Sequence, residues 1–389
     1  MRILYFADIR FPLERANGIQ TIETCYSLAG RGHSVQLVVR PDTQTPARDP
    51  LEYYGLTPRK GLTIERAPVS GPAFARRIGY LAFAAGRASG AGRADIVMTR
   101  DLTAASLILH LPSRAPLVYE SHGYAPEVAA ALPALVSTAT APSASKLARL
   151  ARREAYVWRR AEGYVTITAA LASALTERLG ARPRLAVIPD GARIGNVVAH
   201  AVAGDRVTVG YAGHLYPWKG VDVLVEALAR VPHVRGLIIG GHEKEPDLER
   251  VQALAARLGV SDRIEFTGQI APAAVAARLQ EADILTLPNP ASAISSHATS
   301  PLKLFEYMAA GRAIVASNLP AIGEVLVDDV NAVLVTPGDA GALAAGISRL
   351  AADPTRRRRI ASAARASVAE YSWDRRAERL EALFKVLAQ

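Results

Sequence analysis

The chain has a single cysteine, Cys25, among its 389 residues. One thiol cannot form a disulfide within the chain or supply a thiolate-rich zinc site, so disulfide scaffolds and zinc fingers are excluded. The sequence also lacks the ~18 consecutive apolar residues that a membrane-spanning helix needs. The apolar run at the N-terminus is interrupted by Asp8 and Arg10 and is too short for the core of a signal peptide. We therefore expect a cytoplasmic, globular protein.

The charge is unevenly distributed along the chain. The net charge is +10, and residues 1–195 hold 25 basic against 15 acidic side chains, whereas residues 196–389 hold equal numbers. A basic first half favours an anionic partner, such as a phosphorylated acceptor or the inner face of an anionic membrane. The alternative is that these charges lie on ordinary solvated helices. Zinc-finger spacings and aromatic RNA-binding strands are missing, so we expect no nucleic-acid partner.

Short β-branched runs alternate with Ala/Leu-rich helical patterns throughout the chain. This alternation predicts parallel sheets covered by helices on both faces, and the strands are too numerous for one sheet of ordinary size. Two doubly wound, Rossmann-like domains are expected, with a hinge at residues 188–207, which are rich in glycine and lack periodicity. The predicted strands are Arg2–Ala7, Val35–Val39, Leu62–Arg66, Ile96–Thr99, Leu117–Glu120, Tyr164–Thr168, Arg184–Ile188, Thr208–Ala212, Arg235–Ile239, Ile264–Thr267, Ile284–Leu287, Ala313–Ala316 and Ala332–Val335.

The segment SPLKLFEYMAAGRAIVAS, at residues 300–317, is the most informative in the chain. Ser300 and Pro301 favour the start of a helix, whose free amides and dipole suit a phosphate group. Lys303 in the first turn opposes the dipole, which a bound anion would explain. Glu306, one turn later, can accept hydrogen bonds from two vicinal hydroxyls. The alternative is a structural helix with a surface contact from Lys303 to Glu306 or Tyr307.

Three further loops follow predicted strands, where ligands bind in open parallel sheets. Gly213 ends one strand, and Lys219 at the start of the next helix would place a point charge near a diphosphate. Gly18 precedes the first predicted helix, and this loop again presents amides to an anion. A lone histidine is usually structural, but His122 directly follows a strand, and this position makes a functional role more plausible.

These segments together resemble the retaining family 4 glycosyltransferases, which have the GT-B fold. The motifs that carry the resemblance occur in family order along essentially the whole chain. They are the Gly18 loop, RGHSV at 31–35, YESH at 119–122, VIPDGA at 187–192, GHLYPWKG at 213–220, IIGG at 238–241, FTGQI at 266–270, ADILTLP at 282–288, SPLKLFEYMAAG at 300–311 and YSW at 371–373.

The resemblance implies a domain division and a set of roles. It implies an acceptor-side domain at residues 1–190, a donor-binding domain at 191–365, and a C-terminal helix at 366–389 that crosses back to the first domain. The implied catalytic residues are His122 beside the transferred sugar, Lys219 on the diphosphate and Glu306 on the ribose. The implied donor-binding residues are Gly18, Gly213, His214, Lys219, Gly240, Gly241, Gly268, Gln269, Ile270, Ser300, Pro301, Leu302, Lys303 and Glu306.

Two positions depart from the family pattern. His214 stands where the family places an arginine that pairs with the lysine, and Lys303, Arg100 or Arg193 are candidates to compensate. Ala298 stands eight residues before Glu306, where the family places a glutamate near the sugar hydroxyls. Ser295, Ser296 or His297 are the candidates to replace that glutamate.

We therefore expect a retaining glycosyltransferase whose co-substrate is a nucleotide-diphosphate sugar, with UDP slightly favoured over GDP. No cofactor or metal is expected, because lysine and helix amides take the place of a metal, and Asp328-Asp329 favours a turn. The acceptor is a small molecule, a glycan or a lipid-linked compound. Residues 125–144 and the basic segment 146–160 could touch an anionic membrane surface. The alternatives are a nucleotide-sugar epimerase or hydrolase, and an inactive sugar-nucleotide-binding subunit.

Overall fold

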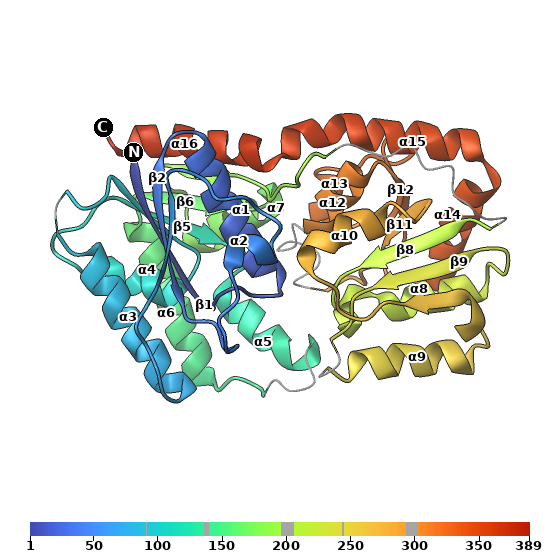
Figure 1. The fold of residues 1–389 in the computed structure, drawn as a ribbon, viewed down its shortest axis with the longest axis horizontal. Helices are drawn as coiled ribbons and strands as arrows, with labels where there is room; N and C mark the ends of the chain where they lie inside the picture. Colours follow the sequence, from blue (N-terminus) through green and yellow to red (C-terminus); the bar gives the residue numbers. More distant parts are fainter. Residues whose placement is uncertain (91, 136–139, 196–205, 243–244, 293–301) are drawn as a thin grey trace. The chain divides into compact units, whose positions relative to one another are not determined.

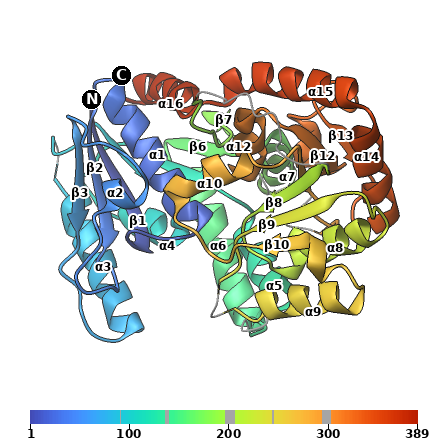
Figure 2. The ribbon, with the colours of Figure 1, turned by 45° about the vertical axis from the view of Figure 1, so that its right-hand side comes forward.

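The computed structural model describes residues 1–389 except 91, 136–139, 196–205, 243–244 and 293–301 (Figure 1). The chain divides into two compact units. Unit 1 comprises Met1–Ala130, Pro142–Asp190 and Trp373–Gln389, and unit 2 comprises Ala131–Ala141 and Gly191–Ser372. Each unit has its own parallel sheet with helices on both faces (Figure 2). Among the described residues, no helix is both long and apolar enough to cross a bilayer.

The sheet of unit 1 has the order β3-β2-β1-β4-β5-β6-β7, and its strands pair in parallel. Consecutive strands run outward from β1 in one direction and from β4 in the other, so the strand order reverses between β1 and β4. The strands are β1 (Arg2–Arg10), β2 (Ser34–Arg40), β3 (Leu62–Arg66), β4 (Ile96–Thr99), β5 (Leu117–Ser121), β6 (Gly163–Thr166) and β7 (Leu185–Val187).

Side chains of β1 alternate between two apolar cores, as the pleat of a strand requires. Ile3 and Tyr5 pack in one core with Ile22 of α1 and Phe384 of α16. Leu4 and Phe6 pack in the other core, with residues of α3, α4 and α6. The helices of this unit are α1 (Ala16–Gly30), α2 (Pro50–Tyr53), α3 (Ala73–Ala88), α4 (Leu102–Ile108), α5 (Ala125–Leu135, which ends in unit 2), α6 (Ala144–Arg160), α7 (Ala169–Leu179) and α16 (Trp373–Leu387).

Unit 2 repeats this plan with the strand order β10-β9-β8-β11-β12-β13, which reverses between β8 and β11. Its strands are β8 (Thr208–Ala212), β9 (Arg235–Ile239), β10 (Ile264–Phe266), β11 (Ile284–Leu287), β12 (Ala313–Ser317) and β13 (Val333–Val335). Its helices are α8 (Val221–Ala229), α9 (Asp247–Arg257), α10 (Pro272–Leu279), α12 (Leu302–Ala310), α13 (Pro320–Gly323), α14 (Ala340–Ala352) and α15 (Pro354–Ser367), with 3-10 turns η1 (Pro217–Lys219), η2 (Ser261–Arg263) and η3 (Val368–Tyr371).

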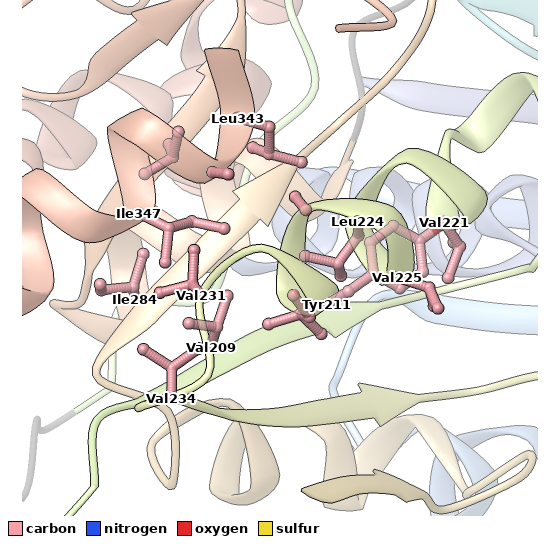
Figure 3. Packing of buried hydrophobic residues seen from close by; sticks show 14 of the residues in the cluster. Val209, Tyr211, Val221, Leu224, Val225, Val231, Val234, Ile284, Leu343 and Ile347 are labelled. Carbon is pink, nitrogen blue, oxygen red and sulfur yellow. The ribbon is translucent and has the colours of Figure 1, made fainter. Parts of the chain in front are cut away.

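The core on one face of this second sheet is made of interlocking aliphatic side chains (Figure 3). Val209 and Tyr211 of β8 lie with Leu224 of α8 and Ile347 of α14, and all four are fully buried. The predicted strands all occur, with ends displaced by three residues or fewer. The α/β prediction is therefore confirmed. In open parallel sheets, ligands bind at the carboxyl ends of the strands beside the point where the strand order reverses, so the loops there are the candidate binding sites.

Candidate functional site

Three loops of unit 2 lie side by side beyond the carboxyl ends of β8, β9 and β10. The amide of Gly213 donates to the carbonyl of Ile239 at 2.8 Å, and the amide of Gly240 donates to the carbonyl of Gly268 at 3.0 Å. The structure therefore brings together the predicted residues Gly213, Gly240 and Gly268 at one edge of the sheet.

The close approach of these loops explains the glycines. The φ angles of Gly213, Gly240 and Gly241 are 132°, 120° and 98°, a region that favours glycine. A Cβ atom on Gly240 would lie 2.3 Å from the carbonyl oxygen of Gly213. The predicted neighbours Gln269 and Ile270 follow the third loop, with Gln269 exposed and Ile270 half-buried.

Lys219 ends the 3-10 turn η1 that leads into α8. The next residue, Gly220, has a φ of 76°, and a Cβ there would lie 1.9 Å from the carbonyl oxygen of Pro288. The Nζ atom of Lys219 lies 3.6 Å from the centroid of the Trp218 ring. Burial lowers the pKa of the Lys219 ammonium to about 7. A nearby anion would offset that desolvation and favour the charged form.

The loop before Lys219 carries a row of stacked rings. The rings of His214 and Tyr216 stack at a centroid distance of 5.0 Å, and those of Tyr216 and Trp218 at 6.5 Å. Tyr216 donates a hydrogen bond of 2.6 Å to the carboxylate of Glu245, and Nδ1 of His214 lies 3.4 Å from the same group. His214 thus has a carboxylate neighbour within unit 2.

Helix α12 is anchored under the end of β8 by two polar contacts. The Nζ of Lys303 donates to the hydroxyl of Tyr211 at 2.7 Å, and the amide of Ala212 donates to the hydroxyl of Tyr307 at 2.7 Å. The alternative of a surface contact for Lys303 is wrong, because its side chain is buried and turned toward Tyr211. Glu306 remains partly accessible on the same helix.

The surroundings of Lys303 disfavour a positive charge on its side chain. Burial and the nearby charge of Lys219 depress its pKa well below 10.5, although Glu306 partly opposes the shift. Leu302, also predicted to contact the donor, is buried. Ser300 and Pro301 lie outside the described residues, as do Ser295, Ser296, His297 and Ala298.

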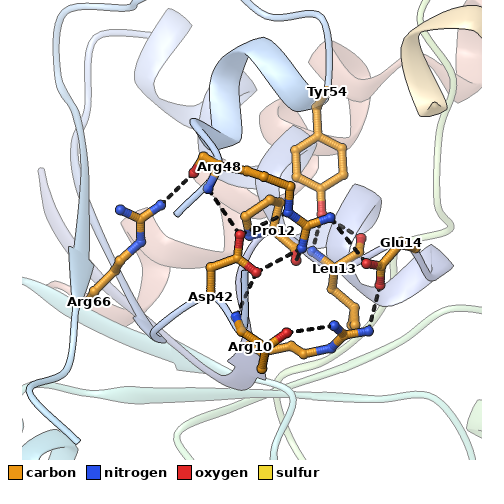
Figure 4. Close-up of polar contacts among 9 residues, drawn as sticks. Arg10, Pro12, Leu13, Glu14, Asp42, Arg48, Tyr54 and Arg66 are labelled. Atoms are coloured by element: carbon orange, nitrogen blue, oxygen red, sulfur yellow. Dashed lines mark hydrogen bonds and ion pairs between the residues drawn. The ribbon is translucent and has the colours of Figure 1, made fainter. Parts of the chain in front are cut away.

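In unit 1, a charged network holds the loop that precedes Gly18 (Figure 4). The guanidinium of Arg48 donates twice to Asp42, at 2.8 Å each, and once to Glu14 at 3.1 Å. Arg10 also donates to Glu14, at 2.7 Å. The network ties the end of β1 to the loop after β2.

Gly18 itself packs against the loop that this network holds. The hydroxyl of Tyr54 donates to the carbonyl of Leu13 at 2.6 Å and accepts from its amide at 2.8 Å. A Cβ on Gly18 would lie 2.3 Å from that hydroxyl and 2.4 Å from the Leu13 carbonyl oxygen. Internal packing is therefore sufficient to require glycine at this position.

His122 lies directly after β5 and contacts a buried carboxylate. Its Nε2 atom lies 2.6 Å from Oε1 of Glu120, and the same oxygen accepts a 2.5 Å hydrogen bond from the amide of Gln20. Arg100, a candidate compensating cation, donates to Gln20 at 2.9 Å. Glu120 is fully buried, whereas the side chain of His122 is 22% exposed.

Arg376 of α16 supplies the cation that balances Glu120. Its guanidinium contacts Oε2 of Glu120 and also donates to the carbonyl oxygens of Ile188 and Pro189 at 2.9 and 3.0 Å. Burial raises the pKa of Glu120, but the charge of Arg376, the hydrogen bond from His122 and the charge of Arg100 outweigh it and bring the pKa to about 2. Burial and Arg100 lower the pKa of His122, so the ring is neutral near pH 7.

The sequence interpretation missed Glu120, Gln20 and Arg376 as members of this site. Glu120 lies within the YESH motif, and that was the available signal, because a carboxylate two positions before a strand-end histidine can reach its ring. The other two gave no signal in the sequence. Arg193, another candidate cation, is exposed in unit 2. The described part of the chain holds no group of three or more His, Cys, Asp or Glu side chains suited to a metal ion.

Two family models match the chain. The model for Glycosyltransferase Family 4 matches residues 18–194, and the model for Glycosyl transferases group 1 matches residues 206–353. The chain belongs to glycosyltransferase family 4, with two parallel-sheet domains of the GT-B fold. The family and fold predictions are confirmed.

A curated relative and two solved structures illustrate the similarity. D-inositol 3-phosphate glycosyltransferase of Xylanimonas cellulosilytica is 34% identical over 187 residues, or 48% of this chain and 43% of that protein. The matched part spans about half the length of such relatives.

The solved sucrose-phosphate synthase of Thermosynechococcus elongatus has a TM-score of 0.80 and 21% identity, covering 99% of this chain and 98% of that one. HepE of Anabaena in complex with UDP-glucose has a TM-score of 0.74 and 20% identity, covering 99% and 100%. Identities this low support the fold alone.

Proposed function

We propose that this protein is a retaining glycosyltransferase that moves a sugar from a nucleotide-diphosphate sugar to an acceptor. The observation that carries the proposal is the grouping in unit 2 of three glycine loops, Lys219 and the helix of Glu306 around the carboxyl end of β8. Two lysines and a partly accessible carboxylate beside closely packed glycine loops are the chemistry that a nucleoside diphosphate needs.

The proposed donor roles follow from this chemistry. Lys219 pairs with the diphosphate, and Lys303 adds a second positive charge beneath Gly213, where a Cβ would lie 2.9 Å from its Nζ. Glu306 accepts hydrogen bonds from the two ribose hydroxyls. His122 contacts the transferred sugar. UDP is the favoured nucleotide, in line with the UDP-glucose complex of HepE, which shares this fold.

The proposed reaction needs positioning and charge stabilisation more than covalent chemistry. The bond between C1 of the sugar and the diphosphate oxygen breaks, and its electron pair leaves with the diphosphate. The acceptor oxygen bonds to C1 on the same face, and its proton passes to the leaving oxygen. Lys219 and Lys303 stabilise the negative charge that develops there, which is why we propose that no metal is required.

The acceptor class is proposed from the charge of unit 1. The relative from Xylanimonas is named for an inositol phosphate substrate, and an anionic acceptor matches the basic excess of residues 1–195. We also propose peripheral contact with an anionic membrane through α3 and α6. Arg77 of α3 and Arg153 of α6 both donate to Thr103, at 3.3 and 3.0 Å, so the two basic helices lie together.

The apolar component of this membrane contact is on α3. Phe74 and Ile78, one turn apart, have exposed fractions of 77% and 52%. Exposed apolar side chains beside arginines are typical of helices that lie at a membrane surface. Sedimentation with vesicles containing phosphatidylserine should recover the wild type and lose the double variant Phe74→Ser/Ile78→Ser, whereas equal recovery of both proteins would exclude this surface.

The first test of the donor proposal is thermal unfolding with UDP, GDP and ADP, each with and without EDTA. A ligand that binds only the native state raises the midpoint. We expect UDP to raise it most, with and without EDTA. A product with inverted anomeric configuration would contradict the retaining reaction. Free sugar formed without an acceptor would favour a hydrolase, and nucleotide binding without any turnover would favour an inactive binding subunit.

A further inference from the structure

Glu120 is a buried carboxylate that receives hydrogen bonds from three directions. Gln20 donates to its Oε1 at 2.5 Å, and the Nε2 of His122 lies 2.6 Å from the same oxygen. Arg376 contacts the other oxygen, and the side chains of Glu120 and Arg376 are 0% and 1% exposed. No solvent reaches this pair to compensate for a missing partner.

The ionised state of Glu120 determines which nitrogen of His122 carries the proton. A carboxylate can only accept hydrogen bonds, and the pKa of Glu120 lies near 2. The contact at Nε2 is therefore a donation, so the neutral ring holds its hydrogen there and keeps a lone pair on Nδ1. Among the described residues, Glu120 is the hydrogen-bond partner of the ring.

Arg376 makes this arrangement possible because an uncompensated carboxylate at this depth would take up a proton. Its own position is held by Thr24, at 3.1 Å from Nε, and by the carbonyl oxygens of Ile188 and Pro189. Helix α16 packs on α1 in the same core, so the last helix of the chain presents its guanidinium from a rigid support.

We infer that Glu120 and Arg376 are positioning residues that hold His122 as the Nε2–H tautomer, so that Nδ1 accepts a hydrogen bond from a hydroxyl of the bound sugar. This inference rests on the proposed function. If Arg376 has this role, α16 is part of the functional site of unit 1. The competing interpretation is that the Glu120–Arg376 pair only stabilises the core.

The tautomer can be measured without any activity. Nitrogen-15 spectra of histidine side chains distinguish protonated from unprotonated ring nitrogens, and the His122→Asn variant assigns the signal. In the wild-type protein at pH 7.5, we expect Nε2 of His122 to be protonated and Nδ1 to be unprotonated. A ring protonated at Nδ1, or an even mixture of tautomers, would overturn the inference even if no donor has been found.

The second test measures turnover of the nucleotide sugar by a Glu120 variant. Glu120→Gln can donate through its amide to the ring, so the preference for Nε2–H should be lost. We expect turnover of the nucleotide sugar to fall by about tenfold or more. The affinity for free UDP, which we assign to unit 2, should stay within about twofold. Glu120→Gln with wild-type turnover and an unchanged tautomer would show that the pair is only structural.

Two further variants separate positioning from folding. Arg376→Lys keeps a buried cation and should recover most of the turnover that Arg376→Met loses. Glu162→Gln is the matched control. Glu162 forms a 2.9 Å ion pair with Arg114 and accepts from the amide of Leu117, at the amino-terminal end of β5 and thus at the opposite edge of the same sheet. The control should lower the melting temperature without changing turnover. If wild-type protein transfers no sugar from any donor, the proposed function fails, and the tautomer still tests the inference.

Discussion

The ammonium of Lys303 donates a 2.7 Å hydrogen bond to the hydroxyl of Tyr211, and both side chains are buried. The same hydroxyl donates to the carbonyl oxygen of His214 at 2.6 Å, so the lysine on α12 is linked to the loop after β8. The ammonium also lies 4.0 Å from the centroid of the Tyr211 ring. A desolvated lysine side chain is thus held under the loops that we assign to the diphosphate.

Lys303→Met should affect stability and binding in opposite directions. The native state binds the lysine proton less tightly than the unfolded state, so this group lowers stability as the pH falls below the unfolded pKa near 10.5. The variant should gain about 1 kcal/mol in the free energy of unfolding at pH 7 and bind UDP about tenfold more weakly. Urea unfolding and calorimetric titration with UDP measure the two effects. Unchanged UDP affinity would remove Lys303 from the donor site.

Lys219→Ala should weaken UDP binding by at least about tenfold, or ~1.4 kcal/mol, because it removes a charge from the diphosphate. The rise in melting temperature with UDP should largely disappear. Lys60→Ala, which changes an exposed lysine in unit 1, is the control and should retain the full rise. Equal shifts in both variants would contradict the role of Lys219.

Glu306→Ala should abolish discrimination between UDP and 2′-deoxy-UDP. The wild type should prefer UDP by about tenfold, since a hydrogen bond to a charged acceptor contributes about 1.5–3 kcal/mol. Competition of the two nucleotides in a turnover assay gives the ratio. Glu226→Ala, an exposed change on α8, should keep the preference. A wild type that binds both nucleotides equally would refute the ribose assignment.

Gly18→Ala should destabilise the protein by about 1–3 kcal/mol, because a methyl group would overlap the Tyr54 hydroxyl and the Leu13 carbonyl. The loss should be smaller in a Tyr54→Phe background, where one of the two clashes is absent. Gly86→Ala on α3 is the control, since nothing lies within 4 Å of its added Cβ, and it should stabilise the helix by about 0.5–1 kcal/mol. Additive losses for Gly18 and Tyr54 would show that the two sites do not interact.

The raised pKa of Glu154 predicts that the free energy of unfolding depends on pH. Burial raises its pKa to about 7, against the opposing hydrogen bonds from Tyr164 and from the amide of Ala125. Since the folded pKa lies above the unfolded value of about 4.3, the stabilising contribution is complete at low pH and is lost as the pH rises through 7.

The free energy of unfolding of wild type should fall between about pH 4.5 and pH 7 because of this group. In Glu154→Gln, that fall should be smaller by up to about 3 kcal/mol. Urea unfolding at a series of pH values measures the difference from wild type. The exposed change Glu249→Gln should leave the profile unaltered. A Glu154→Gln profile parallel to that of the wild type would show that the carboxyl group titrates normally.

The sequence alone was sufficient to predict the elements and the family. β8 and β9 occur at the predicted bounds because each is a short apolar run. Such local signals depend on periodicity and on residues that start or stop an element, which neighbours along the chain are enough to specify. The loops that carry Gly213, Gly240 and Gly268 could be located in the same way, because strand ends of a parallel sheet share an edge.

Only the tertiary structure showed how the charged side chains are paired. No local pattern predicted that the packing of α12 under β8 would bury Lys303 against Tyr211. Glu120 and Arg376 are 256 positions apart, and no local pattern connects them. The final helix brings the arginine to the carboxylate because its apolar face is buried against α1. The sequence determined which residues could carry the chemistry, whereas long-range packing decided which of them are desolvated together, and desolvation sets their charge and proton positions.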